Sequence, residues 1–132
     1  MAKILTCLKK RDLLHDQGIS GDELVQYGRE YLKQDRPVDA LDFFEKAQDL
    51  EGIRQIREWG IGKGDPFLLQ QTTRLLKEPA PEGSWRKIGE KALADGRYQQ
   101  ALVAFKALAD EEKIQEIQAL MRPEKSYAQQ QS

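Results

Sequence analysis

The chain has 132 residues, and its 21 lysines and arginines nearly balance its 22 aspartates and glutamates, so the formal net charge is −1 at pH 7. This balance argues against a dedicated nucleic-acid-binding protein, because such proteins usually carry a strong basic excess. One cysteine excludes an internal disulfide and one histidine excludes most zinc sites. No run approaches the roughly 18 apolar residues that a membrane-spanning helix needs.

The first residues do not have the form of an export signal. Their apolar run, residues 4–8, is shorter than the apolar core of such a signal, and the basic cluster follows the run instead of preceding it. We therefore expect a cytoplasmic protein in which the thiol of Cys7 stays reduced.

The first expected elements are a capping helix within residues 1–19 and a helical hairpin over residues 20–51. Ser20 is the expected N-cap of the hairpin, since Glu23 stands three residues later and completes a capping box. Pro37 suits the first position of the second helix, because the amide hydrogen that it lacks would have no partner there. Apolar residues recur in both helices at steps of three and four, which is typical of helices with one buried face. These residues are Leu24, Tyr27, Gly28, Tyr31 and Leu32, then Ala40, Leu41, Phe44 and Ala47.

Residues 52–78 predict an irregular hairpin between two regular ones. A helical stripe begins at Ile53, and residues 60–64 are expected to be a flexible linker loop because they are rich in glycine. Asp65 is the expected N-cap of one more short helix. The glycines do not indicate a phosphate-binding loop, because no strand precedes them and Lys63 is not followed by serine or threonine.

Residues 84–121 predict a second hairpin followed by a capping helix. Ser84 is the expected N-cap of the first helix, and Gly96 is expected to end that helix in the left-handed conformation. Asp110 is the expected N-cap of the last helix. Residues 122–132 are polar and are expected to form a disordered tail.

The chain repeats itself at an offset of 61 residues. Residues 24–56 then align with residues 85–117, and ten of the 33 aligned pairs are identical, where chance at typical residue frequencies gives about two. Because every periodic stretch repeats near 3.6 residues, we expect residues 1–121 to be one all-α domain built on a duplicated unit. The identical pairs are Gly28/Gly89, Leu32/Leu93, Arg36/Arg97, Ala40/Ala101, Leu41/Leu102, Phe44/Phe105, Asp49/Asp110, Glu51/Glu112, Ile53/Ile114 and Ile56/Ile117.

Two sets of residues at fixed spacing resemble a tetratricopeptide repeat. They are Leu24, Tyr27, Gly28, Tyr31, Ala40, Phe44 and Ala47, and again Trp85, Ile88, Gly89, Ala101 and Phe105. The small Gly28 and Ala40 agree with this resemblance, since they let two antiparallel helices approach closely. It implies antiparallel helical hairpins stacked as a short array, an α–α superhelix. The offset of 61 residues is shorter than two family repeats of about 34 residues, so the middle hairpin is expected to be irregular.

In proteins of this family the first helix of each repeat lines a concave groove that holds a peptide or a partner helix. Alignment to the repeat motif implies that the groove is lined by Asp22, Val25, Arg29, Leu32 and Lys33, and by Arg86, Glu90, Leu93 and Ala94. Arg29 and Lys33 have like charge one helical turn apart, which an acidic partner would offset through charge-assisted hydrogen bonds. The alternative is a basic face that contacts only solvent.

Two further features qualify this groove. Arg86 and Glu90 stand four residues apart with opposite charge and can neutralise each other. The chain has no asparagine, so the carboxylate clamp found in one branch of the family is not present in its usual form. The first repeat is therefore expected to bind an acidic segment more strongly than the second.

The resemblance implies a non-catalytic protein–protein interaction module, an adaptor or assembly factor, with no cofactor and no metal. An enzyme is not expected, because Cys7 and His15 lie about 12 Å apart along a helix, too far for a nucleophile–base pair. One alternative is a self-associating structural protein in which terminal helices pair with another copy. A weaker alternative is nucleic-acid contact through a basic patch, against which the near-zero net charge counts.

Three aromatic residues have no clear position in these patterns. Phe43 and Tyr98 fall off the main apolar stripes, so each could face a partner or the adjacent hairpin. Trp59 could belong to the core of the middle hairpin or form an exposed anchor, and the usual burial of tryptophan favours the core.

Overall fold

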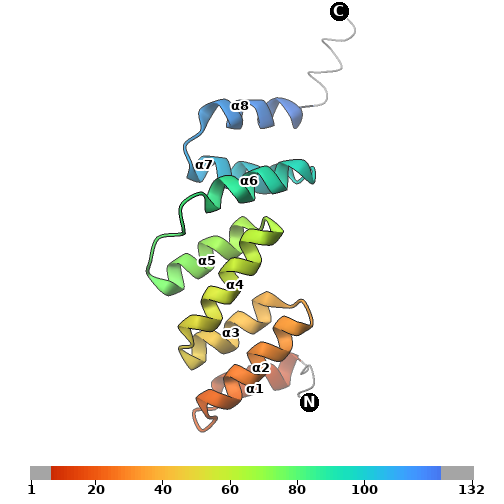
Figure 1. Ribbon diagram of the computed structural model, residues 1–132. Coiled ribbons are helices and arrows are strands. Elements are labelled where there is room, and N and C mark those ends of the chain that lie inside the picture. Colours follow the sequence, from red (N-terminus) through yellow and green to blue (C-terminus); the bar gives the residue numbers. More distant parts are fainter. Residues whose placement is uncertain (1–6, 123–132) are drawn as a thin grey trace, which may run out of the picture. The chain divides into compact units, whose positions relative to one another are not determined.

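The computed structural model describes residues 7–122, and over these residues the chain forms eight helices and no strand (Figure 1). The helices are α1 (Cys7–His15), α2 (Gly21–Lys33), α3 (Pro37–Ala47), α4 (Leu50–Lys63), α5 (Pro66–Leu76), α6 (Ser84–Ala94), α7 (Tyr98–Ala107) and α8 (Glu111–Leu120). Helix α2 packs on α3 and α6 packs on α7, so the predicted all-α fold of helical hairpins is confirmed. None of these helices is both long and apolar enough to cross a membrane.

Parts of two predictions fall on residues that the structure does not describe. Residues 1–6 of the predicted capping helix and residues 123–132 of the predicted tail lie outside the described range. Within that range the first helix is α1, Cys7–His15.

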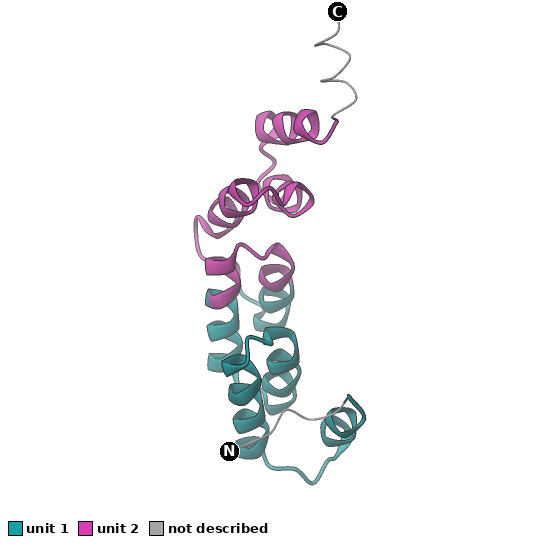
Figure 2. Ribbon diagram, turned by 90° about the vertical axis from the view of Figure 1, so that its right-hand side faces the viewer, with its two compact units in different colours: residues 1–58, 71–78 teal, residues 59–70, 79–132 magenta. Residues whose placement is uncertain are grey.

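The chain divides into two compact units, and the division falls within α4 and α5 (Figure 2). Unit 1 comprises Met1–Glu58 and Gln71–Glu78, and unit 2 comprises Trp59–Gln70 and Pro79–Ser132. Helices α1, α2 and α3 therefore belong to unit 1, and α6, α7 and α8 belong to unit 2.

The α2–α3 hairpin forms as the sequence predicts. The hydroxyl oxygen of Ser20 accepts a hydrogen bond from the amide of Glu23 at 3.2 Å, which confirms the N-cap of α2. Pro37 is the first residue of α3. The ring of the fully buried Phe44 lies against Gly28, where a Cβ atom would be 2.6 Å from Phe44 Cε1. Only glycine permits this close approach of the two helices.

Phe43 belongs to the core of the same hairpin. Its side chain is fully buried, and its ring stacks on Tyr27 and Tyr31 with centroid distances of 5.4 Å and 5.5 Å. The alternative that Phe43 faces a partner is therefore excluded. Its position off the main stripe reflects the wide buried face of α3, which consists of Ala40, Leu41, Phe43 and Phe44.

The α6–α7 hairpin differs from the prediction at its first residue. The N-cap of α6 is Gly83, which has a φ of 82°, and Ser84 is the first helical residue. The predicted N-cap at Ser84 is therefore wrong by one residue, because its hydroxyl donates to the carbonyl of Pro81 at 2.6 Å. Gly96 ends the turn after α6 with a φ of 75°, in the left-handed conformation that the sequence predicts.

Helix α8 packs on α7 and presents a polar face to solvent. Asp110 is its N-cap, as predicted, and accepts a hydrogen bond from the amide of Lys113 at 3.2 Å. Ile114 and Ile117 are buried against α7 in a core that includes Phe105. The exposed side carries Glu111, Glu112, Gln115 and Glu116, as expected of a helix that closes a helical array.

The linker loop predicted at residues 60–64 is wrong, because α4 continues as a helix through Lys63. Gly60 is buried, and a Cβ atom there would lie 2.9 Å from the Cβ of Leu68 on α5. This glycine therefore serves close helix contact and not chain flexibility. Only Gly64 leaves the helix, with a φ of 71°.

The turn between α4 and α5 is held by side chains. Asp65 Oδ1 accepts hydrogen bonds from the amides of Phe67 and Leu68, which confirms the predicted N-cap of α5. Arg97 donates from Nη1 to the carbonyl of Gly64 at 2.9 Å and from Nη2 to that of Lys63 at 3.1 Å. One guanidinium thus closes the C-terminal end of α4, where a positive charge is favourable.

Arg97→Met is expected to lower the free energy of unfolding by about 1–2 kcal/mol, because two carbonyl groups lose a charged donor. The matched control is Arg36→Met at the corresponding position of the first repeat. Arg36 bonds Asp39 at 2.9 Å and lies over the Tyr31 ring, contacts of a kind that contribute less than about 1 kcal/mol at a surface. Urea denaturation of both variants measures the difference, and equal losses would contradict the role of Arg97 as a helix cap.

Candidate protein-binding surfaces

Five of the predicted groove residues lie on α2, and the first of them, Asp22, is exposed. Val25 and Leu32 are half-buried, whereas Arg29 and Lys33 are exposed. Within residues 7–122 neither cation forms an ion pair. Two cations one turn apart therefore stand on α2 without a carboxylate from the described chain to neutralise them.

The other four groove residues, of which Ala94 is the last, lie on α6, and their surroundings differ. Arg86 and Glu90 are exposed, but Arg86 Nη1 lies 3.4 Å from Asp110 Oδ2, the carboxylate that also caps α8. The partner of Arg86 is thus Asp110 in place of the expected Glu90. Leu93 packs against the core of α6, α7 and α8. The α6 residues belong to unit 2 and the α2 residues to unit 1, so each half of the predicted groove is a face of one helix.

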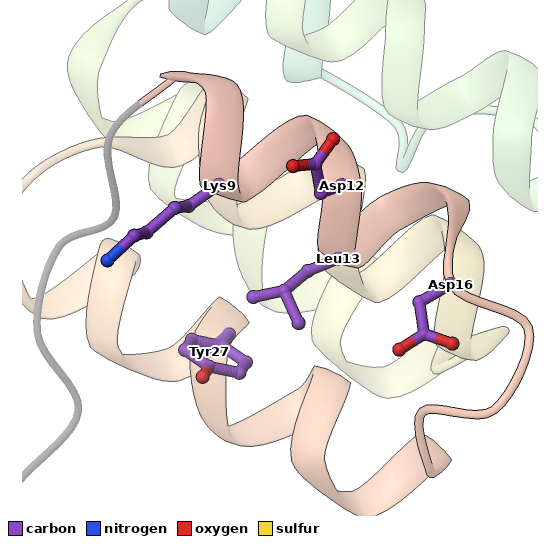
Figure 3. Close-up of a pocket in the computed structure, with 5 residues that line it drawn as sticks. All are labelled: Lys9, Asp12, Leu13, Asp16 and Tyr27. Atoms are coloured by element: carbon purple, nitrogen blue, oxygen red, sulfur yellow. The ribbon is translucent and has the colours of Figure 1, made fainter.

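A hollow that the sequence did not predict lies between α1 and α2 in unit 1 (Figure 3). It measures about 350 Å³ and is lined by Lys9, Asp12, Leu13 and Asp16 from α1 and the residue after it, and by Tyr27 from α2. In Figure 3 the side chain of Leu13 points toward the ring of Tyr27. The sequence marks this hollow only by Asp12 and Asp16, two aspartates that stand four residues apart.

Lys10 of α1 forms ion pairs with two carboxylates of α3. Lys10 Nζ lies 2.6 Å from Asp39 Oδ1 and 2.7 Å from Asp42 Oδ2, both on α3. Burial alone would lower the pKa of Lys10, but its bonds to the two carboxylates outweigh burial and raise that pKa. Burial would likewise raise the pKa of Asp39, and the bond from Lys10 lowers it. Both groups stay charged across the neutral range, so this contact persists there.

A second lysine binds the other end of α1. Lys46 on α3 donates from Nζ to the carbonyl oxygens of Leu13, at 3.0 Å, and Asp16, at 2.7 Å. These carbonyls lie at the C-terminal end of α1, where helix carbonyls lack intrahelical partners. Helix α3 therefore holds α1 at two points, one near its start and one at its end.

Unit 1 also has a second, smaller hollow and a cluster of two arginines around one glutamate. A hollow of about 220 Å³ on α1 and α3 is lined by Cys7, Lys10, Arg11, Leu14, His15, Arg36 and Asp39. On α4, Arg54 and Arg57 both bond the Oε1 atom of Glu78, at 3.3 Å and 2.9 Å. These hydrogen bonds tie α4 to Glu78, which follows α5. They also hold the pKa of Glu78 below its usual range.

Within the described residues, no group of three or more histidine, cysteine, aspartate or glutamate side chains could hold a metal ion. Cys7 and His15 stand at opposite ends of α1 and are both exposed. Comparison with protein-family models, with curated proteins and with solved structures finds no match for this chain. A function for this chain is therefore inferred from the surfaces described above.

Proposed function

We propose that this chain is a cytoplasmic, non-catalytic protein-binding module, similar to a tetratricopeptide-repeat protein, whose α2 face binds an acidic segment of another protein. The observation that carries the proposal is the pair of exposed cations, Arg29 and Lys33, that form no ion pair within the described chain. Half-buried Val25 and Leu32 on the same helix offer apolar contact beside them.

The chemistry of this face favours a carboxylate-bearing partner. Arginine binds a carboxylate through two parallel hydrogen bonds, and lysine adds a second positive charge one turn further along the helix. The like charges of Arg29 and Lys33 repel each other in the free chain, and a bound acidic segment removes this repulsion. The α6 face contributes less in this proposal, because Asp110 already neutralises Arg86.

The test compares capture of partners from the native cytoplasm by the wild-type chain and by Arg29→Glu/Lys33→Glu. The double variant is expected to weaken binding of the captured partner at least about tenfold, measured by calorimetry, with an unchanged circular dichroism spectrum. A matched control is Arg74→Glu/Lys106→Glu, which changes the same residue types and the same net charge at exposed positions that form no ion pair with the described residues.

Each result of this experiment decides between the proposals. A partner that the α2 variant loses and the control retains supports the α2 face. A partner that both variants retain contradicts that face, and one that both lose indicates binding by net charge alone. Recovery of only the chain itself would favour the self-associating structural protein.

A further inference from the structure

Helix α1 rests on the first hairpin without burying any of its own residues. It has nine residues, none is buried, and Leu8 is 64% exposed. A helix this short is marginal in water by itself, since helices in proteins depend mostly on packing of an apolar face. The two polar contacts described above, through Lys10 and Lys46, therefore hold α1 together with the half-buried Leu13 and Leu14.

Two open hollows border α1. The hollow of about 350 Å³ separates part of α1 from α2, and the hollow of about 220 Å³ adjoins α1 and the start of α3. Both hollows are open to solvent, so parts of α1 and of the hairpin beside them stay uncovered.

We propose that α1 is a replaceable occupant of a helix-docking face on the first hairpin, and that an amphipathic helix of another protein takes its place by inserting a lysine or arginine between the carboxylates of Asp39 and Asp42. The docking face is formed by Asp39, Asp42 and Lys46 of α3 and by Tyr27 of α2. It is separate from the face of Arg29 and Lys33.

The chemistry of the partner follows from what α1 shows. Asp39 and Asp42 stand three residues apart on α3, so one ammonium group reaches both, as that of Lys10 does. Lys46 donates hydrogen bonds to carbonyl groups at the C-terminal end of a helix. A partner helix that places apolar side chains on Tyr27 buries apolar surface that α1 leaves open, and this difference favours the partner over α1.

The first experiment measures how firmly α1 is held. Hydrogen exchange of the full chain is compared between wild type, Lys10→Met and the control Lys106→Met, whose lysine is exposed on α7. In Lys10→Met the α1 amides are expected to exchange about tenfold faster, while the α3 amides are unchanged. High salt is expected to have the same effect in wild type. Unchanged exchange of α1 would contradict the proposal.

The second experiment tests the docking face with a defined probe. The probe is a peptide of residues 7–19, made helical by a hydrocarbon staple that replaces the exposed Cys7 and Arg11. Fluorescence anisotropy is expected to show about tenfold tighter binding to the Lys10→Met chain than to wild type, because the wild-type α1 competes for the same face. Further substitution of Asp39→Asn and Asp42→Asn in the chain is expected to abolish binding.

Two controls keep this test decisive. A probe in which Lys10 is replaced by methionine is expected not to bind. Equal binding of both probes, or no binding up to about 1 mM, would overturn the proposal. Sedimentation of the wild-type chain, which keeps Lys10, is expected to show a monomer, and a dimer would mean that the face receives α1 of a second copy and not a different partner.

Discussion

Phe44→Ala is expected to lower the free energy of unfolding by about 3–5 kcal/mol, the usual loss when a buried phenylalanine becomes alanine. The ring of Phe44 is fully buried and contacts two helices besides its own. A Cβ atom at Gly28 on α2 would lie 2.6 Å from it, and one at Gly52 on α4 would lie 2.8 Å from it. Removal of the ring leaves a cavity bordered by two glycines, which have no side chains to fill it.

The matched control for this prediction is Val38→Ala on the same helix. The side chain of Val38 is 56% exposed, so its truncation is expected to change stability by less than about 0.5 kcal/mol. Guanidinium denaturation of wild type and both variants gives the free energies. A loss below about 1 kcal/mol for Phe44→Ala would mean that the hairpin repacks around the missing ring.

The sequence predicts the hairpins well because their signals are local. A cap such as Ser20 or Asp65 requires only residues within one helical turn, and Pro37 marks a helix start by its own covalent structure. The apolar stripes depend on the helical period alone. These features do not depend on which helix packs against which, so the chain order is enough to find them.

The N-cap error at Ser84 is local, since its hydroxyl bonds Pro81, but the error at residues 60–64 occurs because a residue's role depends on a distant neighbour. The glycine-rich residues 60–64 predict a loop, but Gly60 faces Leu68 on α5, and only this contact distinguishes close packing from flexibility. The sequence leaves two alternatives open for Phe43 for the same reason, since its burial depends on Tyr27 and Tyr31 of α2.

The sequence predicts only part of the candidate surfaces. The sequence shows the apolar stripe of α2. Arg29 and Lys33 lie on the other side of this helix, so their exposure can be predicted. The ion pairs of Lys10 with Asp39 and Asp42 cannot be found in this way. Their carboxylates lie 29 and 32 residues further along the chain, and no periodic pattern links α1 to α3. Contacts of this kind depend on how one helix docks on another.

Gly28→Ala is expected to destabilise the protein by about 2–3 kcal/mol, although alanine favours a helix over glycine by about 1 kcal/mol. The new methyl group would overlap the ring of Phe44, with three ring atoms at 2.6–3.0 Å. The ring has little room to move away, because Gly52 of α4 also lies against it.

The same substitution at a glycine without close neighbours separates these two effects. Gly62 lies in α4, and a Cβ atom added there would meet nothing within 4 Å, so Gly62→Ala is expected to stabilise the protein by about 0.5 kcal/mol. Opposite signs in urea denaturation would assign the loss at Gly28 to contact with Phe44. A double-mutant cycle with Phe44→Leu checks the assignment, because the smaller side chain is expected to remove at least half of the loss. Equal effects of alanine at Gly28 and Gly62 would show instead that α2 and α3 can separate to admit the methyl group.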